Sequence, residues 1–279
     1  MTNLLSEEIP YQQLKYQYFN LKNSNENLLD GLYYAAYVQQ GLMPQARHFE
    51  KLNYPYFIIY QPLQIIGGDF FWLAKKGEWD LFAVGDCTGH GVSGAMLSAL
   101  AIGFLNYLIY SKEFKHIGEI LNLLDKKWIE TFNSNFDDEI RFDNDWLSIS
   151  LIAFNRNTRE LQFAGAQNSI LVVEDNMLNT LKGNSYPIGG WQIEKNRKYD
   201  TCFKMLREKS KIYLYSDGYK DQIGGIKNKR YGSQNFTQAI LSIAVLDMHS
   251  QKNELISSFM SWKKSEDQTD DICIMSLEL

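Results

Sequence analysis

The chain has 279 residues, enough to bury one sizeable domain core and to carry an appendage. Its net charge of −5 argues against nucleic acid as the main partner, because phosphate-backbone binding requires a basic face. The three cysteines, Cys87, Cys202 and Cys273, are widely separated, which indicates reduced thiols and not a disulfide framework. The first residues have no basic start and no long apolar run, so we expect no signal peptide and a cytoplasmic location.

The segment up to about Leu42 is predicted to be a helix with a heptad seam, and Pro44 ends it. A polar residue, Asn25, lies inside the seam, where such a residue can fix the register of paired helices. Two interpretations stay open: an amphipathic helix packed on its own domain, or a helix that forms a homodimer. The seam consists of Tyr11, Leu14, Tyr18, Leu21, Asn25, Leu28, Leu32, Ala35, Gln39 and Leu42.

After residue 56 the pattern changes to short strand-like runs and amphipathic helices that come in blocks. Blocks of this kind favour an α+β fold, with antiparallel sheets and helices packed outside. An acidic loop is expected at residues 135–145. The expected strands are 56–60, 69–73, 80–84, 147–154, 160–164, 170–174, 201–206, 211–215 and 272–278, and the expected helices are 92–110, 117–132, 235–246 and 251–262.

The run 92–110 has no charged residue and is about as long as a membrane-crossing helix. It begins inside a Gly-His turn and contains small and polar residues, so we interpret it as a buried core helix. We therefore expect no membrane span.

Acidic residues recur where the predicted strands begin or end. Asp69 starts one strand, Asp86 and Asp217 each end one, and Asp270 and Asp271 precede the last. Acidic residues are common in turns and N-caps, so any one of them alone means little. Several carboxylates at one sheet edge would repel each other unless cations lay between them. Oxygen-rich sites of this kind prefer Mg²⁺ or Mn²⁺, and two such ions can activate water and hold a phosphoryl group.

These acids lie in an ordered set of motifs that resembles the SpoIIE/RsbU-type branch of the metal-dependent PP2C (PPM) protein phosphatases. The helical run 34–44 and the stretch 217–225 also resemble segments of that branch. The motifs are Gly67-Gly68-Asp69-Phe70, Gly85-Asp86-Cys87-Thr88-Gly89-His90-Gly91-Val92 with Gly94-Ala95, Phe163-Ala164-Gly165-Ala166, Tyr215-Ser216-Asp217-Gly218 and Thr269-Asp270-Asp271.

The resemblance implies an α-β-β-α sandwich over residues 45–279, preceded by a helical linker or dimerisation segment at 1–44. It also implies a two-metal site. Asp86 would bridge both ions, Asp217 and Asp270 would complete the first site, and Asp69 with the Cys87 carbonyl would serve the second. The choice between Asp270 and Asp271 as ligand stays open.

A metal-bound hydroxide would attack phosphoserine or phosphothreonine without a phosphoenzyme. Substrates in this branch are typically phosphorylated anti-anti-sigma (STAS-type) proteins of bacterial partner-switching systems. The rival interpretation is a catalytically inactive binding module with the same fold, but the complete acidic set argues against it.

Three further residues are candidates for a role in catalysis or phosphate binding. His90 is a candidate general acid for the leaving oxygen, because a histidine near a metal site can be poised near neutral pH. The eukaryotic members use an arginine near the phosphate, whereas residues 62–66 here offer no cation. Lys220 and Arg230 are candidates for phosphate binding, and ordinary solvated surface positions are the alternative.

Overall fold

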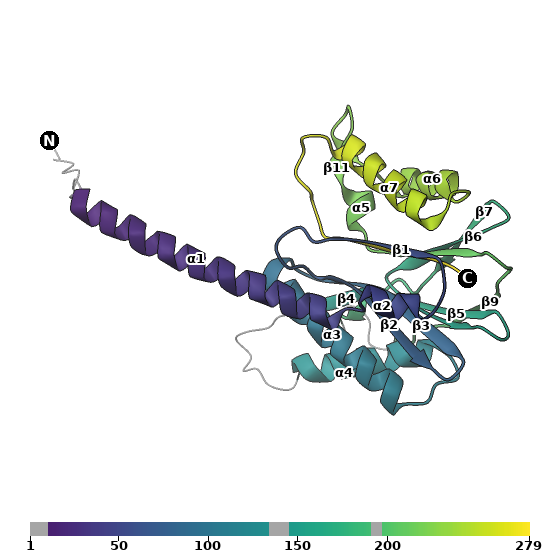
Figure 1. The fold of residues 1–279 in the computed structure, drawn as a ribbon. Helices are drawn as coiled ribbons and strands as arrows, with labels where there is room; N and C mark the ends of the chain where they lie inside the picture. Colours follow the sequence, from purple (N-terminus) through teal and green to yellow (C-terminus); the bar gives the residue numbers. More distant parts are fainter. Residues whose placement is uncertain (1–10, 134–144, 191–196) are drawn as a thin grey trace.

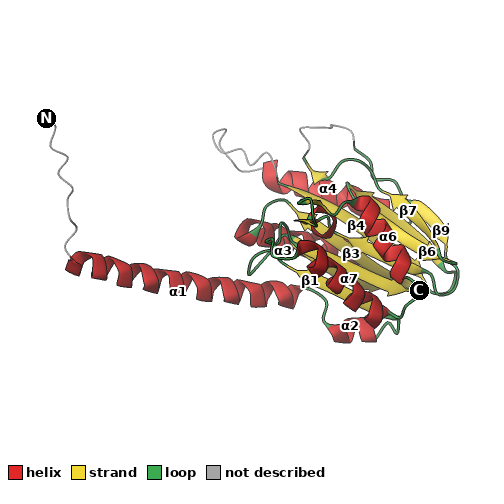
Figure 2. Ribbon diagram, turned by 90° about the horizontal axis from the view of Figure 1, so that it is seen from above, coloured by secondary structure: helices red, strands yellow, loops and turns green. Residues whose placement is uncertain are grey.

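The computed structural model describes residues 11–133, 145–190 and 197–279 (Figure 1). The start of the N-terminal segment and nearly all of the expected acidic loop lie outside the described residues. The described part of the chain begins with the long helix α1 (Tyr11–Leu42), which ends where the sequence predicts. The elements that follow form two stacked sheets with helices on their outer faces (Figure 1), and Figure 2 looks down onto this stack.

Both sheets are antiparallel. The first has the order β1-β13-β10-β6-β7, with bounds Tyr56–Gln61, Ile272–Glu278, Lys211–Tyr215, Ser169–Glu174 and Met177–Lys182. The second has the order β2-β3-β4-β5-β9, and β8 pairs with β4. Its strands are β2 Asp69–Lys76, β3 Trp79–Cys87, β4 Trp146–Asn155, β5 Glu160–Ala166, β9 Cys202–Met205 and β8 Ile188–Gly189.

Two helices cover each sheet. The pair α3 (Gly91–Ser111) and α4 (Gly118–Asn133) packs on the second sheet, and α6 (Ser233–Ile243) and α7 (Met248–Lys263) pack on the first. The shorter elements are α2 Ala46–Glu50, α5 Gly218–Asp221, β11 Ile223–Gly224 and β12 Lys229–Arg230. This arrangement confirms the expected α-β-β-α sandwich.

The alternation of side chains along each strand builds the core in layers. In β10, Ile212 and Leu214 point between the two sheets, whereas Tyr213 and Tyr215 point outward under α6 and α7. All four are buried, which explains why this strand reads as a continuous apolar run. The same layering brings the two sheets close enough for residues of both to share one edge.

The charge-free helix α3 lies against β2, β3 and α4. Among the described residues it is the one helix long and apolar enough to cross a membrane, yet ten of its residues are buried inside the fold. The fold therefore uses this apolar sequence as a core helix.

The sequence analysis missed six short elements, α2, α5, β7, β8, β11 and β12. The strand β7 lies at a sheet edge and is mostly exposed, with the sequence Met-Leu-Asn-Thr-Leu-Lys, so it has little apolar signal. The strand β8 has only two residues and α2 only five. Elements this short depend on tertiary packing more than on local pattern.

Candidate active site

The structure brings the carboxylates from four places in the chain to one edge of the sandwich. Asp69 and Asp86 are cross-strand partners in the β2–β3 register. Asp217 follows β10 and Asp270 precedes β13, and these two strands are neighbours in the other sheet. The site therefore joins the ends of both sheets, as the sequence motifs predict.

A pocket of about 450 Å³ opens at this edge. Asp86, Asp217 and Asp270 line it, while Asp69 lies buried behind them. The other lining residues are Leu63, Cys87, Thr88, Gly89, His90, Trp146, Ser148, Gln167 and Thr269. Acidic and polar groups thus surround a space of the size used by small-molecule and cofactor sites.

Glycines allow the backbone to close tightly around the Asp86 turn. A Cβ on Gly68 would lie 2.5 Å from the Cys87 carbonyl oxygen, and one on Gly94 would lie 2.5 Å from the Gly89 carbonyl oxygen. Gly89 itself has a φ of +84°, a conformation that a side chain disfavours. The glycine pattern in the sequence therefore reflects close backbone approach at the site.

Burial and mutual repulsion raise the pKa values of the two innermost carboxyl groups. Burial, followed by the charge of Asp86, raises the pKa of Asp69, although the Ser216 hydroxyl opposes this by donating a hydrogen bond to it. Burial, followed by the charges of Asp217 and Asp270, raises the pKa of Asp86. Both shifts mean that the charged carboxylates lack sufficient compensating positive charge.

The outer carboxyl groups behave in the same way. Desolvation, with the charges of Asp217, Asp271 and Asp221, raises the pKa of Asp270 to about 6, although the residue is exposed as a whole. Burial also raises the pKa of Asp217. The ammonium of Lys220 acts in the opposite direction on Asp86 and Asp217, so this lysine belongs to the electrostatic environment of the site.

Asp271 has different surroundings from Asp270. Its two carboxylate oxygens accept hydrogen bonds from the backbone amides of Leu63 and Gly68, each at 2.6 Å. It is buried and fastens the loop between β1 and β2 beside Asp69. The backbone amide of Asp271 in turn donates to Asp270 at 2.8 Å.

The residues at this edge fit a site for divalent cations. They are hard oxygen donors, and no lysine or arginine forms an ion pair with Asp69, Asp86, Asp217 or Asp270 among the described residues. Within the described residues, no compact group of three or more Asp, Glu, His or Cys side chains is already arranged to hold a metal ion.

The remaining predicted residues lie at different distances from the pocket. His90 is exposed at the pocket wall, and its Nδ1 lies 3.0 Å from Gln64 Nε2. Arg230 is exposed and bonds Asp221 at 3.2 Å, so its guanidinium is directed to the end of α5. The Cys87 thiol is buried, and burial raises its pKa, which agrees with a structural role for this side chain.

Sequence reasoning missed three polar residues that hold the site together. Ser216 contacts Asp69, Gln64 contacts His90, and Gln39 of α1 donates to the Gly67 carbonyl oxygen at 2.6 Å. Ser216 was visible as the neighbour of Asp217, and Gln39 as a second polar residue in the heptad seam. Gln64 gave no signal, because its partner is 26 residues away.

The family model for Stage II sporulation protein E (SpoIIE) matches residues 79–279. The chain belongs to the SpoIIE family. Its fold and motifs place it with the PP2C-type proteins of the SpoIIE/RsbU branch, a metal-dependent group. Among curated proteins, none matches the chain by sequence.

Solved structures show the same fold. The SiaA-PP2C domain of Pseudomonas aeruginosa is 25% identical, with a TM-score of 0.82 over 92% of this chain and 98% of that one. The PP2C phosphatase domain of SpoIIE from Bacillus subtilis, with a fragment of its regulatory domain, is 14% identical, with a TM-score of 0.63 over 81% and 63%. RsbX in complex with magnesium is 14% identical, with a TM-score of 0.54 over 80% and 94%.

Proposed function

We propose that this protein is a metal-dependent serine/threonine protein phosphatase. The observation that carries the proposal is the meeting of Asp69, Asp86, Asp217 and Asp270 at one sandwich edge in a SpoIIE-family chain. Their raised pKa values mark a concentration of negative charge that divalent cations would neutralise. An inactive binding module would have no need to keep so unfavourable a cluster.

The proposed site holds two Mn²⁺ or Mg²⁺ ions. Asp86 is assigned to both, Asp217 and Asp270 to the first, and Asp69 with the Cys87 carbonyl oxygen to the second. When bound, the ions supply a water of lowered pKa and a positive field for the phosphoryl group. The magnesium complex of RsbX, a protein with the same fold, supports this choice of cation class.

The chain's own side chains then orient the substrate and handle the proton. His90 lies at the pocket wall, where it donates a proton to the serine or threonine oxygen as the bond to phosphorus breaks. The Gln64 side-chain amide contacts Nδ1 at 3.0 Å, which leaves Nε2 of the protonated imidazole to donate. Lys220 offers positive charge to the phosphate, whereas Arg230 pairs with Asp221 and links β12 to α5.

Asp271 is proposed as a positioning residue and not as a metal ligand. Its carboxylate already accepts two backbone amides, and these bonds hold the loop that leads into Asp69. Asp270 keeps a carboxyl group at the pocket and is therefore the better ligand candidate.

The proposed substrate is a phosphorylated signalling protein, with a STAS-type protein as the class that the family resemblance suggests. The test is phosphate release from phosphoserine and phosphothreonine peptides with Mn²⁺, with Mg²⁺ and with excess chelator. We expect release only with the cations and its loss in Asp86→Asn. Release that continues in excess chelator would refute the metal mechanism, and no release under any condition would favour the inactive binding module.

A further inference from the structure

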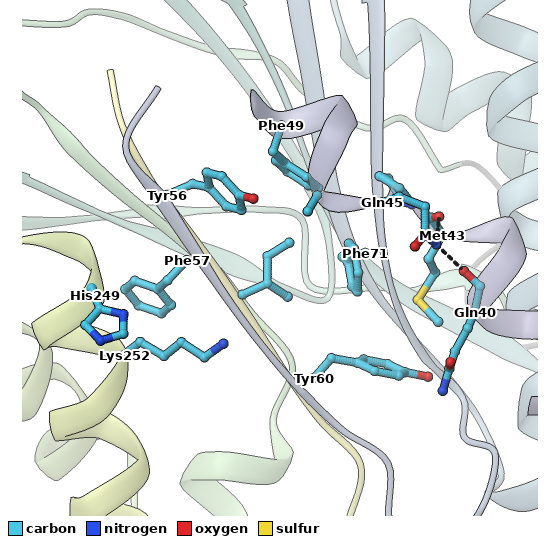
Figure 3. Close-up of a pocket in the computed structure, with 13 residues that line it drawn as sticks. Gln40, Met43, Gln45, Phe49, Tyr56, Phe57, Tyr60, Phe71, His249 and Lys252 are labelled. Atoms are coloured by element: carbon cyan, nitrogen blue, oxygen red, sulfur yellow. Dashed lines mark hydrogen bonds between the residues drawn. The ribbon is translucent and has the colours of Figure 1, made fainter. Parts of the chain in front are cut away.

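A second pocket, of about 480 Å³, lies beside the edge strand β1 and shares no lining residue with the acidic site (Figure 3). We call it the β1 groove. It is bounded by the end of α1, the short helix α2, the strands β1 and β2, and the helix α7. Its lining is Gln40, Met43, Pro44, Gln45, Ala46, Phe49, Tyr56, Phe57, Ile58, Tyr60, Phe71, His249 and Lys252.

The strand β1 offers an unused backbone edge to this groove. It pairs with β13 on one side, and among the described residues no strand pairs with it on the other. The groove is lined by the consecutive residues Tyr56, Phe57 and Ile58 and by Tyr60, so it follows the strand itself. An edge of this kind can accept a further strand through backbone hydrogen bonds.

The two sides of this edge differ in chemistry (Figure 3). On the side facing the other sheet, Phe49 stacks on Tyr56 at 4.8 Å between ring centroids, and Phe71 lies 5.8 Å from Tyr60 in an edge-on arrangement. On the opposite side lie His249 and Lys252 of α7. A strand added to β1 would therefore direct alternate side chains to an aromatic surface and to a basic one.

The charges around the groove favour an acidic partner on the α7 side. Lys252 is half-buried and forms no ion pair with any described residue, and neither does His249. The nearby acid, Glu50, is on the aromatic side, where burial and then its charge raise the pKa of Tyr56. Among the residues that line the groove, the basic ones are therefore all on the α7 side.

We propose that the β1 groove binds an extended segment of a partner protein in which acidic and apolar residues alternate. The segment adds to β1 as an edge strand. Its acidic side chains face Lys252 and His249, and its apolar side chains face Phe49 and Phe71. This binding needs no metal ion and no phosphatase activity.

The first test uses fluorescent peptides about eight residues long, the usual upper range of a strand. One alternates glutamate and valine, a second has the same composition in two blocks, and a third alternates lysine and valine. Binding to the full chain is followed by fluorescence anisotropy at low salt, with chelator present. We expect the alternating acidic peptide to bind at least about tenfold more tightly than the other two, with an affinity that falls with salt.

The second test reverses the charge on the protein. Lys252→Glu should lower the affinity for the alternating acidic peptide by about tenfold or more and raise the affinity for the alternating lysine peptide. Lys209→Glu is the matched control, because Lys209 is an exposed lysine in the turn between β9 and β10. It changes net charge equally and should leave both affinities within about twofold.

The third measurement identifies the mode of binding. Slower amide hydrogen exchange within Tyr56–Gln61 on adding the peptide is expected for strand addition. Equal binding of the block peptide, or no effect of Lys252→Glu, would overturn the proposal. So would protection of β1 that depends on protein concentration alone, which would assign the groove to a second copy of the chain. Displacement of the peptide by a simple fatty-acid anion with no exchange protection would indicate a small-molecule site instead.

Discussion

The neighbouring acids Asp270 and Asp271 show how residue type alone leaves a role open. Both are aspartates that precede β13, yet one lies at the pocket and the other is buried under two backbone amides. A carboxylate that accepts backbone N–H groups fastens a loop, whereas one among other carboxylates attracts cations. The difference comes from partners more than 200 residues away, Leu63 and Gly68.

This contrast predicts opposite behaviour of two single variants. Asp270→Asn should raise the Mn²⁺ concentration for half-activation by about tenfold or more, with little change in Tm. Asp271→Asn should lower stability by about 1–3 kcal/mol, because an amide cannot accept both backbone donors as a carboxylate does. Thermal melts in chelator and metal titrations of phosphate release distinguish the two. The reverse pattern would reassign the ligand to Asp271.

The central carboxylate, Asp86, is expected to lower the stability of the metal-free fold while being required for activity. Burial and repulsion raise the pKa of Asp86, so its charged form destabilises the metal-free fold at neutral pH. Asp86→Asn should therefore raise the metal-free Tm, by about 2–4 °C for each kcal/mol of relieved repulsion, while abolishing activity.

The raised pKa of Asp86 also fixes how this difference in stability depends on pH. The folded state binds more protons than the unfolded state, so the penalty is full above the folded pKa and fades as the pH falls through it. The Tm advantage of Asp86→Asn over the wild type should shrink between pH 7.5 and about 5. A metal-free Tm below that of the wild type at neutral pH would contradict this account.

At the scale of elements, the sequence predicted the long strands, the core helices and the clustered strand-end acids. These features depend on local periodicity, as in β10, where burial on both faces gives a continuous apolar run. The sequence could not predict contacts such as Gln39 with Gly67, or Asp271 with Leu63, because these contacts depend on how distant elements pack. The β1 groove escaped for the same reason, since five separate elements line it.

The contact between α1 and the β1–β2 loop gives a prediction for an element. Gln39 is the one buried residue of α1, and its amide donates to Gly67 and to the Ser98 hydroxyl at 2.8 Å. Gln39→Ala would leave the Gly67 carbonyl oxygen short of a partner beside Asp69, at a cost of about 1–3 kcal/mol. We expect kcat/KM to fall by about tenfold because the loop that carries Asp69 loosens. The exposed Gln12→Ala on the same helix is the matched control, and equal activity of the two variants would show that α1 does not position the loop.

At the scale of the whole molecule, α1 is the feature that the domain fold does not explain. It projects away from the sandwich, and only its end contacts α3 (Figure 1). Its seam residues Leu14, Leu21 and Leu28 are 54%, 71% and 63% exposed. A helix with an apolar stripe of this length in water favours pairing with another helix. The first interpretation, a helix packed along its own domain, is therefore disfavoured, and we propose that α1 forms a parallel dimer with a second copy.

The dimer predicts that charges within the seam separate the two copies. In the double variant Leu21→Asp/Leu28→Asp, each helix loses two leucines that the dimer would bury, worth about 1.5–3 kcal/mol apiece, and places like charges face to face. We expect the dissociation constant to rise at least about a hundredfold, measured by sedimentation across micromolar concentrations. The control Asn20→Asp/Asn27→Asp adds the same charges with the same spacing outside the seam and should remain dimeric. A wild-type chain that stays monomeric across that range would rule out the dimer.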